Sequence, residues 1–284
     1  MSGIVSGIDY SVLFSGSASF NGGASGNLLS ILYGNGRGSG GVSLSDPIAA
    51  LAQAESHQTA EVAQEAASPA VARDIAAFKA AIAKAPNITS ALQNPAVLQV
   101  LLTANNLVNQ IPYPALAQKA LMSDLSDPKS LANQLTDTRW KTAAATYNFA
   151  SAGLAALQNP ATQATLANAY AEVTWLNSLD QTTPGLSSAL TFKQHAASIT
   201  SIDQILGDPI YRDVVTTAFA IPLQIAFQDL PAQEKAISSQ LDLTQLKNAN
   251  FVNGLTDRYL LAKQQAASTG ATTGLNSFAG GLTV

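Results

Sequence analysis

"FKAAIAKAPNITSALQNP" (residues 78–95) and "FKQHAASITSIDQILGDP" (residues 192–209) decide the fold, because they repeat one pattern 114 positions apart. Each ends in Asn-Pro or Asp-Pro, an N-cap residue followed by proline at the first helical position, where the missing N–H costs nothing. After the first pair, Val97, Leu98 and Leu101 keep helical spacing. Both stretches therefore predict a helix that stops and a new helix that begins at the proline.

Pairs of the same kind recur along the chain and predict further helix starts. They are Asp46-Pro47, Ser68-Pro69, Asp127-Pro128 and Asn159-Pro160. The β-branched residues are scattered among Ala, Gln and Leu and show no alternation of period two, which a half-buried strand would need. The pattern predicts an all-α body from about residue 46 to about residue 265.

The repeated phrase extends beyond the two quoted stretches. With six residues inserted in the second copy, "LANQLTDTRW" from Leu131 aligns with "FVNGLTDRYL" from Phe251. Matching residue types in the same order over this length indicate a duplicated multi-helix unit, residues 69–148 and 186–265, bridged by a longer helix within residues 149–185. The two similar faces are expected either to pack on each other or to offer two contacts to a partner. The best-matched pairs are Phe78 and Phe192, Leu92 and Leu206, Pro95 and Pro209, and the "LTD" at 135–137 and 255–257.

The two ends of the chain are rich in Gly and Ser, which predicts flexible tails over residues 1–44 and 266–284. Two short apolar islands interrupt the first tail, and we interpret them as docking anchors for a partner. The alternative is that they fold back on the protein's own surface. Residues 45–68 are expected to form a helix that is exposed or rests on a partner through its alanines. The docking candidates are Ile8, Tyr10, Leu13, Phe14, Leu28, Leu29, Leu32 and Tyr33.

Composition excludes several classes of protein. The net charge is −4 and no basic stripe is visible, which argues against binding to nucleic acid. The absence of cysteine excludes disulfides and thiolate sites. The most apolar stretch, "TTAFAIPLQIAF", has 12 residues and contains Pro222, so we expect no membrane span. No secretory signal is recognisable at the N-terminus, so the protein is expected to be soluble, or exported by a route that needs no cleaved signal.

Candidate chemistry is sparse. His57 and His195, the two histidines, have no second ligand at a suitable spacing, so we expect no metal and no cofactor. No nucleophile elbow or phosphate-binding loop follows a predicted strand. The repeated Thr-Asp, at Asp137 with Arg139 and at Asp257 with Arg258, forms either an ion pair and binding spot or a helix N-cap. The N-cap is the interpretation that we favour, because Thr and Asp are common there.

Three stretches carry a family resemblance that covers about residues 70–265. They are "ALQNPAVLQVLLTANNL" (91–107), "YPALAQKALMSDLSDPKSLANQLTDTRW" (113–140) and "YNFA" (147–150). They resemble an alphaproteobacterial family known as domain of unknown function 1217, whose genes often lie among flagellar genes. The second copy departs from this pattern, with Leu260 where the first has Trp140. The resemblance implies a role associated with the flagellum and supplies no catalytic residues.

These observations lead us to expect a non-enzymatic structural or assembly protein that is located in the bacterial flagellum. It is expected to bind flagellar or other proteins, and self-association is left open. The Gly/Ser-rich ends lack the heptad-patterned helices of axial flagellar proteins, which favours an accessory component. Export of this component through the flagellar apparatus is compatible with such ends. The alternative is a cytoplasmic helical adaptor or chaperone that binds another protein through a repeated face.

Overall fold

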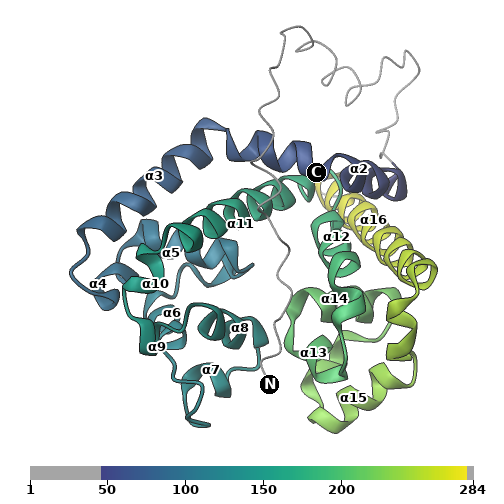
Figure 1. The fold of residues 1–284 in the computed structure, drawn as a ribbon. Coiled ribbons are helices and arrows are strands. Elements are labelled where there is room, and N and C mark those ends of the chain that lie inside the picture. Colours follow the sequence, from purple (N-terminus) through teal and green to yellow (C-terminus); the bar gives the residue numbers. More distant parts are fainter. Residues whose placement is uncertain (1–45, 280–284) are drawn as a thin grey trace, which may run out of the picture. The chain divides into compact units, whose positions relative to one another are not determined.

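The structure is a computed structural model that describes the backbone of residues 46–279 and the side chains of residues 46–269. Within this part of the chain every regular element is a helix, which confirms the predicted all-α fold (Figure 1). The elements up to the middle of the chain are α2 (Pro47–Ala66), α3 (Pro69–Lys84), α4 (Ile88–Leu92), α5 (Pro95–Ala104), η2 (Val108–Gln110), α6 (Pro114–Leu121), α7 (Leu131–Gln134), α8 (Thr138–Tyr147), α9 (Phe149–Ala152) and α10 (Ala155–Gln158).

The second half of the chain is helical as well. Its elements are α11 (Pro160–Leu179), α12 (Leu186–His195), η3 (Ala196–Ser198), α13 (Ile202–Gly207), α14 (Pro209–Ala218), η4 (Leu223–Phe227), α15 (Leu230–Ser238), η5 (Leu243–Lys247) and α16 (Ala249–Ala279). Because α16 continues to Ala279, the first part of the tail predicted as flexible over residues 266–284 is helical. No proline interrupts residues 249–279, and alanine and glutamine are good helix formers.

Most of the Asx-Pro and Ser-Pro pairs open helices as predicted. The Asn94 side chain accepts from the Ala96 N–H at 2.9 Å, and Asp208 accepts from the Ile210 N–H at 2.8 Å. Asp46, Ser68 and Asn159 cap α2, α3 and α11 in the same way. The prediction was wrong at Asp127-Pro128, which lies in a turn before α7. There Asn133 donates to the Asp127 carbonyl at 2.9 Å and holds the turn closed.

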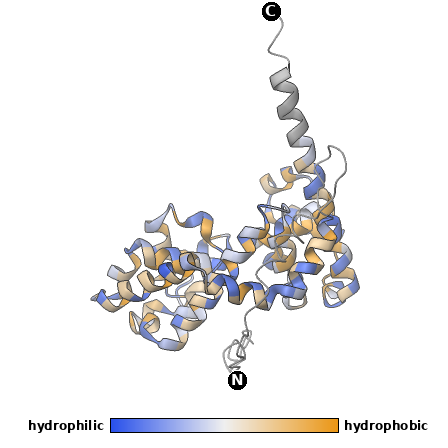
Figure 2. Cartoon of the chain, turned by 90° about the horizontal axis from the view of Figure 1, so that it is seen from above, coloured by the Kyte–Doolittle hydropathy of each residue, from blue (hydrophilic) through white to orange (hydrophobic). Residues whose placement is uncertain are grey.

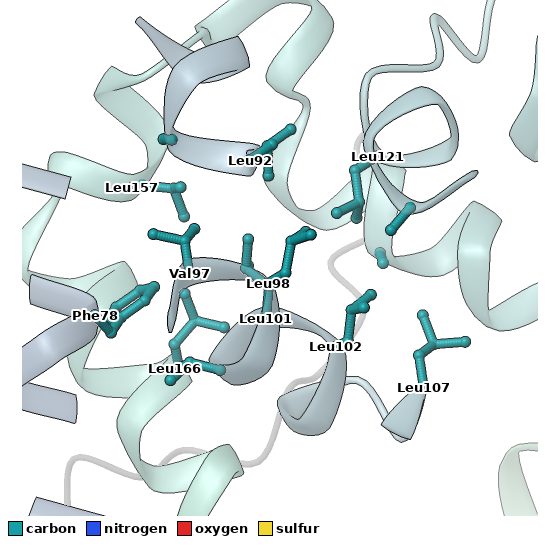
Figure 3. Packing of buried hydrophobic residues seen from close by; sticks show 14 of the residues in the cluster. Phe78, Leu92, Val97, Leu98, Leu101, Leu102, Leu107, Leu121, Leu157 and Leu166 are labelled. Atoms are coloured by element: carbon teal, nitrogen blue, oxygen red, sulfur yellow. The ribbon is translucent and has the colours of Figure 1, made fainter. Parts of the chain in front are cut away.

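The first hydrophobic cluster is built mainly from α3, α5 and the first half of α11. Figure 3 shows Phe78 pointing toward Val97 and Leu166 from the neighbouring helices, with Leu157 beside them. The Phe78 ring has no exposed surface, and Trp140 of α8 and Phe149 are buried in the same cluster. Residues 71–171 therefore have a core of their own.

The second hydrophobic cluster is built mainly from α12, α14 and α16. It contains Phe192, which has no exposed surface, together with Val214, Leu255 and Tyr259. Tyr259 donates its hydroxyl to Asp213 at 2.8 Å, so this buried ring has a partner for its polar end. The second core is thus closed by a hydrogen bond between α14 and α16.

Local features recur at the spacing of the sequence repeat. Pro95 and Pro209 each open a helix, and each of these helices ends in a turn whose last residue has positive φ, 57° at Asn106 and 52° at Ala220. The next N–H closes both turns in the same way, Leu107 to the Leu102 carbonyl at 2.7 Å and Ile221 to the Thr216 carbonyl at 2.8 Å.

The two segments then diverge. In the first segment the helical structure is interrupted at Leu135, between α7 and α8. In the second segment α16 continues through the matching residues. Duplication of the whole unit stays a prediction.

Helix α11 is shared by the two clusters. Its Leu166, Tyr170 and Ala171 belong to the first, and its Trp175 and Leu176 belong to the second. The segment 149–185 also contains the short helices α9 and α10 before α11. One continuous helix with apolar residues on successive turns thus contributes to both cores.

Helix α2 packs on other helices of the same chain. It contacts α11, α12 and α16, and it buries Leu51 and Ala54 in the second cluster. Glu55 forms an ion pair with Lys193 of α12, with 2.6 Å between carboxylate oxygen and Nζ. The remaining face of α2 is exposed, and that face carries the polar residues of its later turns.

Hydrophilic and apolar residues are interleaved along the helices in Figure 2. This is the pattern of amphipathic helices around a water-excluding core. Among the described residues, no helix has the length and continuous apolar character that crossing a membrane requires.

Candidate functional site

The docking residues predicted from the sequence lie outside the described part of the chain. These are Ile8, Tyr10, Leu13, Phe14, Leu28, Leu29, Leu32 and Tyr33. Their role as partner anchors stays a prediction. Two other places in the described part have the character of a site: a polar cleft and an exposed apolar loop.

The cleft has a volume of about 430 Å³ and is lined by residues of α8 on one side and of α12, α13 and α14 on the other. Helices α8 and α13 approach closely, since a Cβ on Gly207 would lie 2.4 Å from the methyl group of Thr138. Glycine is required at this contact because any side chain would push the two helices apart. The cleft is therefore a built feature of the fold, lined mostly by polar side chains.

Arg139 is the most constrained charge in the cleft. Its guanidinium donates to both carboxylate oxygens of Asp137, at 2.9 and 2.7 Å, and also to the carbonyl of Asn106. Asp137 in turn accepts from the Arg139 N–H at 3.1 Å and so caps α8. The ion pair and the N-cap, considered as alternatives from the sequence, are both present here. An arginine with its donors engaged in this way holds the α8 terminus in place.

The second Thr-Asp does not cap a helix, so that part of the N-cap interpretation was wrong. Thr256 is buried within α16 and donates to the Val252 carbonyl at 3.0 Å. Arg258 lies over the Phe219 ring, 5.1 Å from its centre, and donates to the Gly254 carbonyl. The residues before "LTD" differ: "SLANQ" permits a break at Leu135, whereas "FVNG" continues a helix whose apolar side chains are buried.

The titratable groups of the cleft are held by backbone groups. The His195 ring nitrogen Nδ1 lies 2.8 Å from the Thr191 carbonyl, which can only accept, so Nδ1 donates this hydrogen bond. Burial raises the pKa of Asp208, which also caps α14. Burial and the charge of Asp208 raise the pKa of the Tyr211 hydroxyl. Among the described lining residues, none of these groups is arranged as a nucleophile beside a base.

The apolar loop, residues 219–230, leads from α14 through η4 to α15. Three of its large apolar side chains face water: Leu223 is 76% exposed, Phe227 is 91% exposed and Leu230 is 53% exposed. The positive φ of Ala220 turns the chain away from α14, and Pro222 prevents a further α-helical turn. Tyr113, which matches Phe227 at the repeat spacing, is 60% exposed. An exposed aromatic residue thus recurs before α6 and before α15.

Sequence reasoning missed this loop. From the sequence, the stretch "TTAFAIPLQIAF" leads only to the expectation that no segment spans a membrane. A signal was present, because proline and glutamine interrupt the apolar residues and leave neither helical nor strand periodicity. Such a stretch cannot place all its apolar side chains on one buried face.

Residues 104–252 match the family model described as Protein of unknown function (DUF1217). The chain belongs to the DUF1217 family. This confirms the family resemblance of the sequence, and the matched range includes α8, the cleft and the apolar loop. No curated protein matches the chain.

A crystal structure of a protein from Agrobacterium tumefaciens, solved by a structural genomics consortium, is similar to this DUF1217 protein. It has a TM-score of 0.64 and 22% sequence identity, and the match covers 79% of this chain and 96% of the other. At this identity the likeness concerns the fold. Its alphaproteobacterial source is consistent with the family resemblance.

Proposed function

We propose that this DUF1217 protein is a non-enzymatic structural or assembly protein of the bacterial flagellum, which acts through contacts with other proteins. The observation that carries the proposal is the apolar loop, where Leu223, Phe227 and Leu230 face water on one short segment. Exposed apolar groups that gather in one place are typical of surfaces that bind proteins. The flagellum as the location rests on the family resemblance.

The energy of such a contact is substantial. Burying one large apolar side chain is worth about 1.5–3 kcal/mol relative to leaving it in water. Phe227 and Leu223 are the two most exposed of the large apolar residues in the described part of the chain. A partner that covers both would gain enough to offset part of the entropy lost on association.

The cleft supports the non-enzymatic part of the proposal. Arg139 is engaged by Asp137 and a backbone carbonyl, and Asp208 is engaged as a helix cap. Both side chains therefore have a part in holding helix termini. Catalysis would require a nucleophile and a base in mutual reach.

A cytoplasmic adaptor or chaperone is the second candidate, since the same apolar loop suits a partner that is bound before export. Fractionation separates the two candidates. The flagellar protein is expected in sheared flagella or in the medium, whereas the adaptor is expected in the cytosol.

The test is a deletion strain examined for motility and, by electron microscopy, for filaments. We expect loss of motility, restored by the wild-type gene but not by the double variant Leu223→Ser/Phe227→Ser. The matched control is Thr142→Ser, at an exposed position of α8. Full motility of the deletion strain would refute the flagellar role, and full rescue by the double variant would refute the role of the apolar loop.

A second arm of the same experiment tests the tail. Both hydrophobic clusters are built from residues beyond position 50, so deleting residues 1–44 is expected to leave the melting temperature of the helical body unchanged. We expect this deletion to abolish assembly or export. Full motility of the truncated protein would contradict the docking role of the predicted tail residues.

A further inference from the structure

Acidic residues gather at the end of the apolar loop that leads into α15, whereas Arg258 of α16 lies over the Phe219 ring at its start. Residues 219–234 contain two acidic residues, Asp229 and Glu234, and no Lys or Arg. A third carboxylate, Asp203 of α13, interacts directly with Glu234 of α15. The loop is therefore an apolar surface with an acidic edge.

The geometry of α15 places this edge beside the apolar side chains. Leu230 and Glu234 are one helical turn apart on α15, so their side chains are neighbours on the helix surface. Helix α15 also packs against both η4 and α13. Partial burial raises the pKa of Glu234, and the neighbouring carboxyl group of Asp203 raises it further.

The two carboxylates have no cation of their own in the described part of the chain. The ion pairs there involve Asp74, Asp137, Glu55 and Asp213, and neither Asp203 nor Glu234. The charged residues on the elements that pack against α13 and α15, or on α15 itself, are Arg139, Lys141, Arg212, Asp213 and Lys235. Arg139 is held by Asp137, and Arg212 donates to the Leu206 carbonyl. When both carboxylates are ionised they repel each other, and a cation supplied by a partner would relieve this repulsion.

We propose that the apolar loop docks a basic amphipathic segment of a partner protein. Apolar side chains of that segment cover Leu223, Phe227 and Leu230, and a Lys or Arg one turn away reaches Asp203 and Glu234. The inference rests on the proposed function in one respect, that the protein acts through protein contacts. It adds the acidic edge of that surface and the chemistry of the partner.

The acidic edge also decides against other occupants. Anionic lipid and nucleic acid carry the same sign of charge as the edge and are repelled by it. A second copy of the chain would bring one acidic edge toward another. A basic amphipathic segment complements both the apolar side chains and the acidic edge. Burial of the apolar side chains provides most of the affinity, and the charges provide selectivity and salt dependence.

The probe is a fluorescein-labelled 18-residue synthetic peptide with leucines at helical spacing and lysines elsewhere, and its control is the same peptide with glutamate in place of lysine. Fluorescence anisotropy measures binding to the full chain. We expect the lysine peptide to bind and the glutamate peptide to bind at least about tenfold more weakly. Leu223→Ser/Phe227→Ser is expected to weaken lysine-peptide binding at least about tenfold, since exposed anchors of this kind dominate interface affinity.

Charge variants separate the contribution of the acidic edge to binding from that of the apolar side chains. Asp203→Asn/Glu234→Gln is expected to weaken binding of the lysine peptide about threefold or more and to reduce its salt dependence. The control Tyr113→Ser removes an exposed aromatic side chain elsewhere and is expected to leave binding unchanged. Circular dichroism and melting temperature confirm that each variant is folded, which is expected because Phe227 makes little contact with the core.

Two results would overturn the proposal. One is equal binding of the lysine peptide to the wild-type protein and to Leu223→Ser/Phe227→Ser. The other is a dimer in sedimentation experiments that dissociates in that double variant, because the occupant would then be a second copy. These outcomes are distinct from failure of the proposed function. A deletion strain with no motility defect refutes the flagellar role whatever the peptide does.

Discussion

Replacing Phe78 by alanine tests the packing of the first cluster. The Phe78 ring has no exposed surface and lies among Val97, Leu157 and Leu166 (Figure 3). The substitution loses the transfer free energy of the ring and leaves a cavity, because α3 is held in place by α5 and α11. Changes of this kind cost about 3–5 kcal/mol. For a body of this size, such a loss lowers the melting temperature by roughly 10 °C.

The matched control is Phe227→Ala, the same change at a side chain that is 91% exposed. It should alter the free energy of unfolding by less than about 0.5 kcal/mol. Urea unfolding followed by circular dichroism at 222 nm measures both variants, and an unchanged m-value shows that the transitions are comparable. A cost for Phe78→Ala below about 1 kcal/mol, or equal to that of the control, would refute the packing described for this cluster.

Phe192→Ala extends the argument to the second cluster. Phe192 is as completely buried as Phe78 and is in edge contact with Tyr211, with 5.9 Å between ring centres. If the two units are duplicates, the two substitutions should cost similar amounts. Costs that differ by more than about 2 kcal/mol would indicate different surroundings and argue against the duplication.

Further substitutions test backbone strain, capping and charge. Ala220→Gly should raise the free energy of unfolding by about 0.5–1 kcal/mol, because φ is 52° there, while Ala145→Gly on the exposed face of α8 should lower it by about 1 kcal/mol; thermal unfolding compares them. Asp137→Ala should cost about 2–4 kcal/mol because it removes the cap of α8 and the mostly buried partner of Arg139, whereas Asp257→Ala inside α16 should cost little; equal costs in urea would show that the α8 cap is unimportant. The raised pKa of Glu234 means that the folded state binds its proton more tightly, so this group's stabilising contribution is present at acidic pH and is lost as pH rises through the folded pKa. Glu234→Gln should therefore raise the melting temperature at pH 7 and have little effect at pH 4, and the reverse pattern would contradict the repulsion from Asp203.

Local signals in the sequence predicted the helices well. Asn94-Pro95 and Asp208-Pro209 open helices because a side-chain oxygen next to proline stabilises a helix start independently of distant residues. The failure at Asp127-Pro128 has a tertiary cause. Contacts from Asn133 to the Leu125 and Asp127 carbonyls favour a turn there, and nothing in the local pattern shows that Asn133 folds back.

The interaction surface was harder to predict from the sequence. Apolar islands in the first 44 residues stand out between Gly and Ser as candidate anchors, whereas the apolar loop lies within the helical body and has no such contrast around it. Whether an apolar residue is buried depends on what packs against it. In this loop the positive φ of Ala220 and the short helix η4 turn Leu223 and Phe227 toward water.

The sequence by itself determined the helical class of this protein, most helix starts and the buried positions of Phe78 and Phe192, because caps, prolines and apolar spacing act over a few residues. Only the tertiary structure decided that α2 packs with the second cluster through Leu51, and that Asp203 and Glu234 meet beside the apolar loop. These contacts join residues far apart in the chain. Their free energy depends on the packing of whole helices, which no local pattern records.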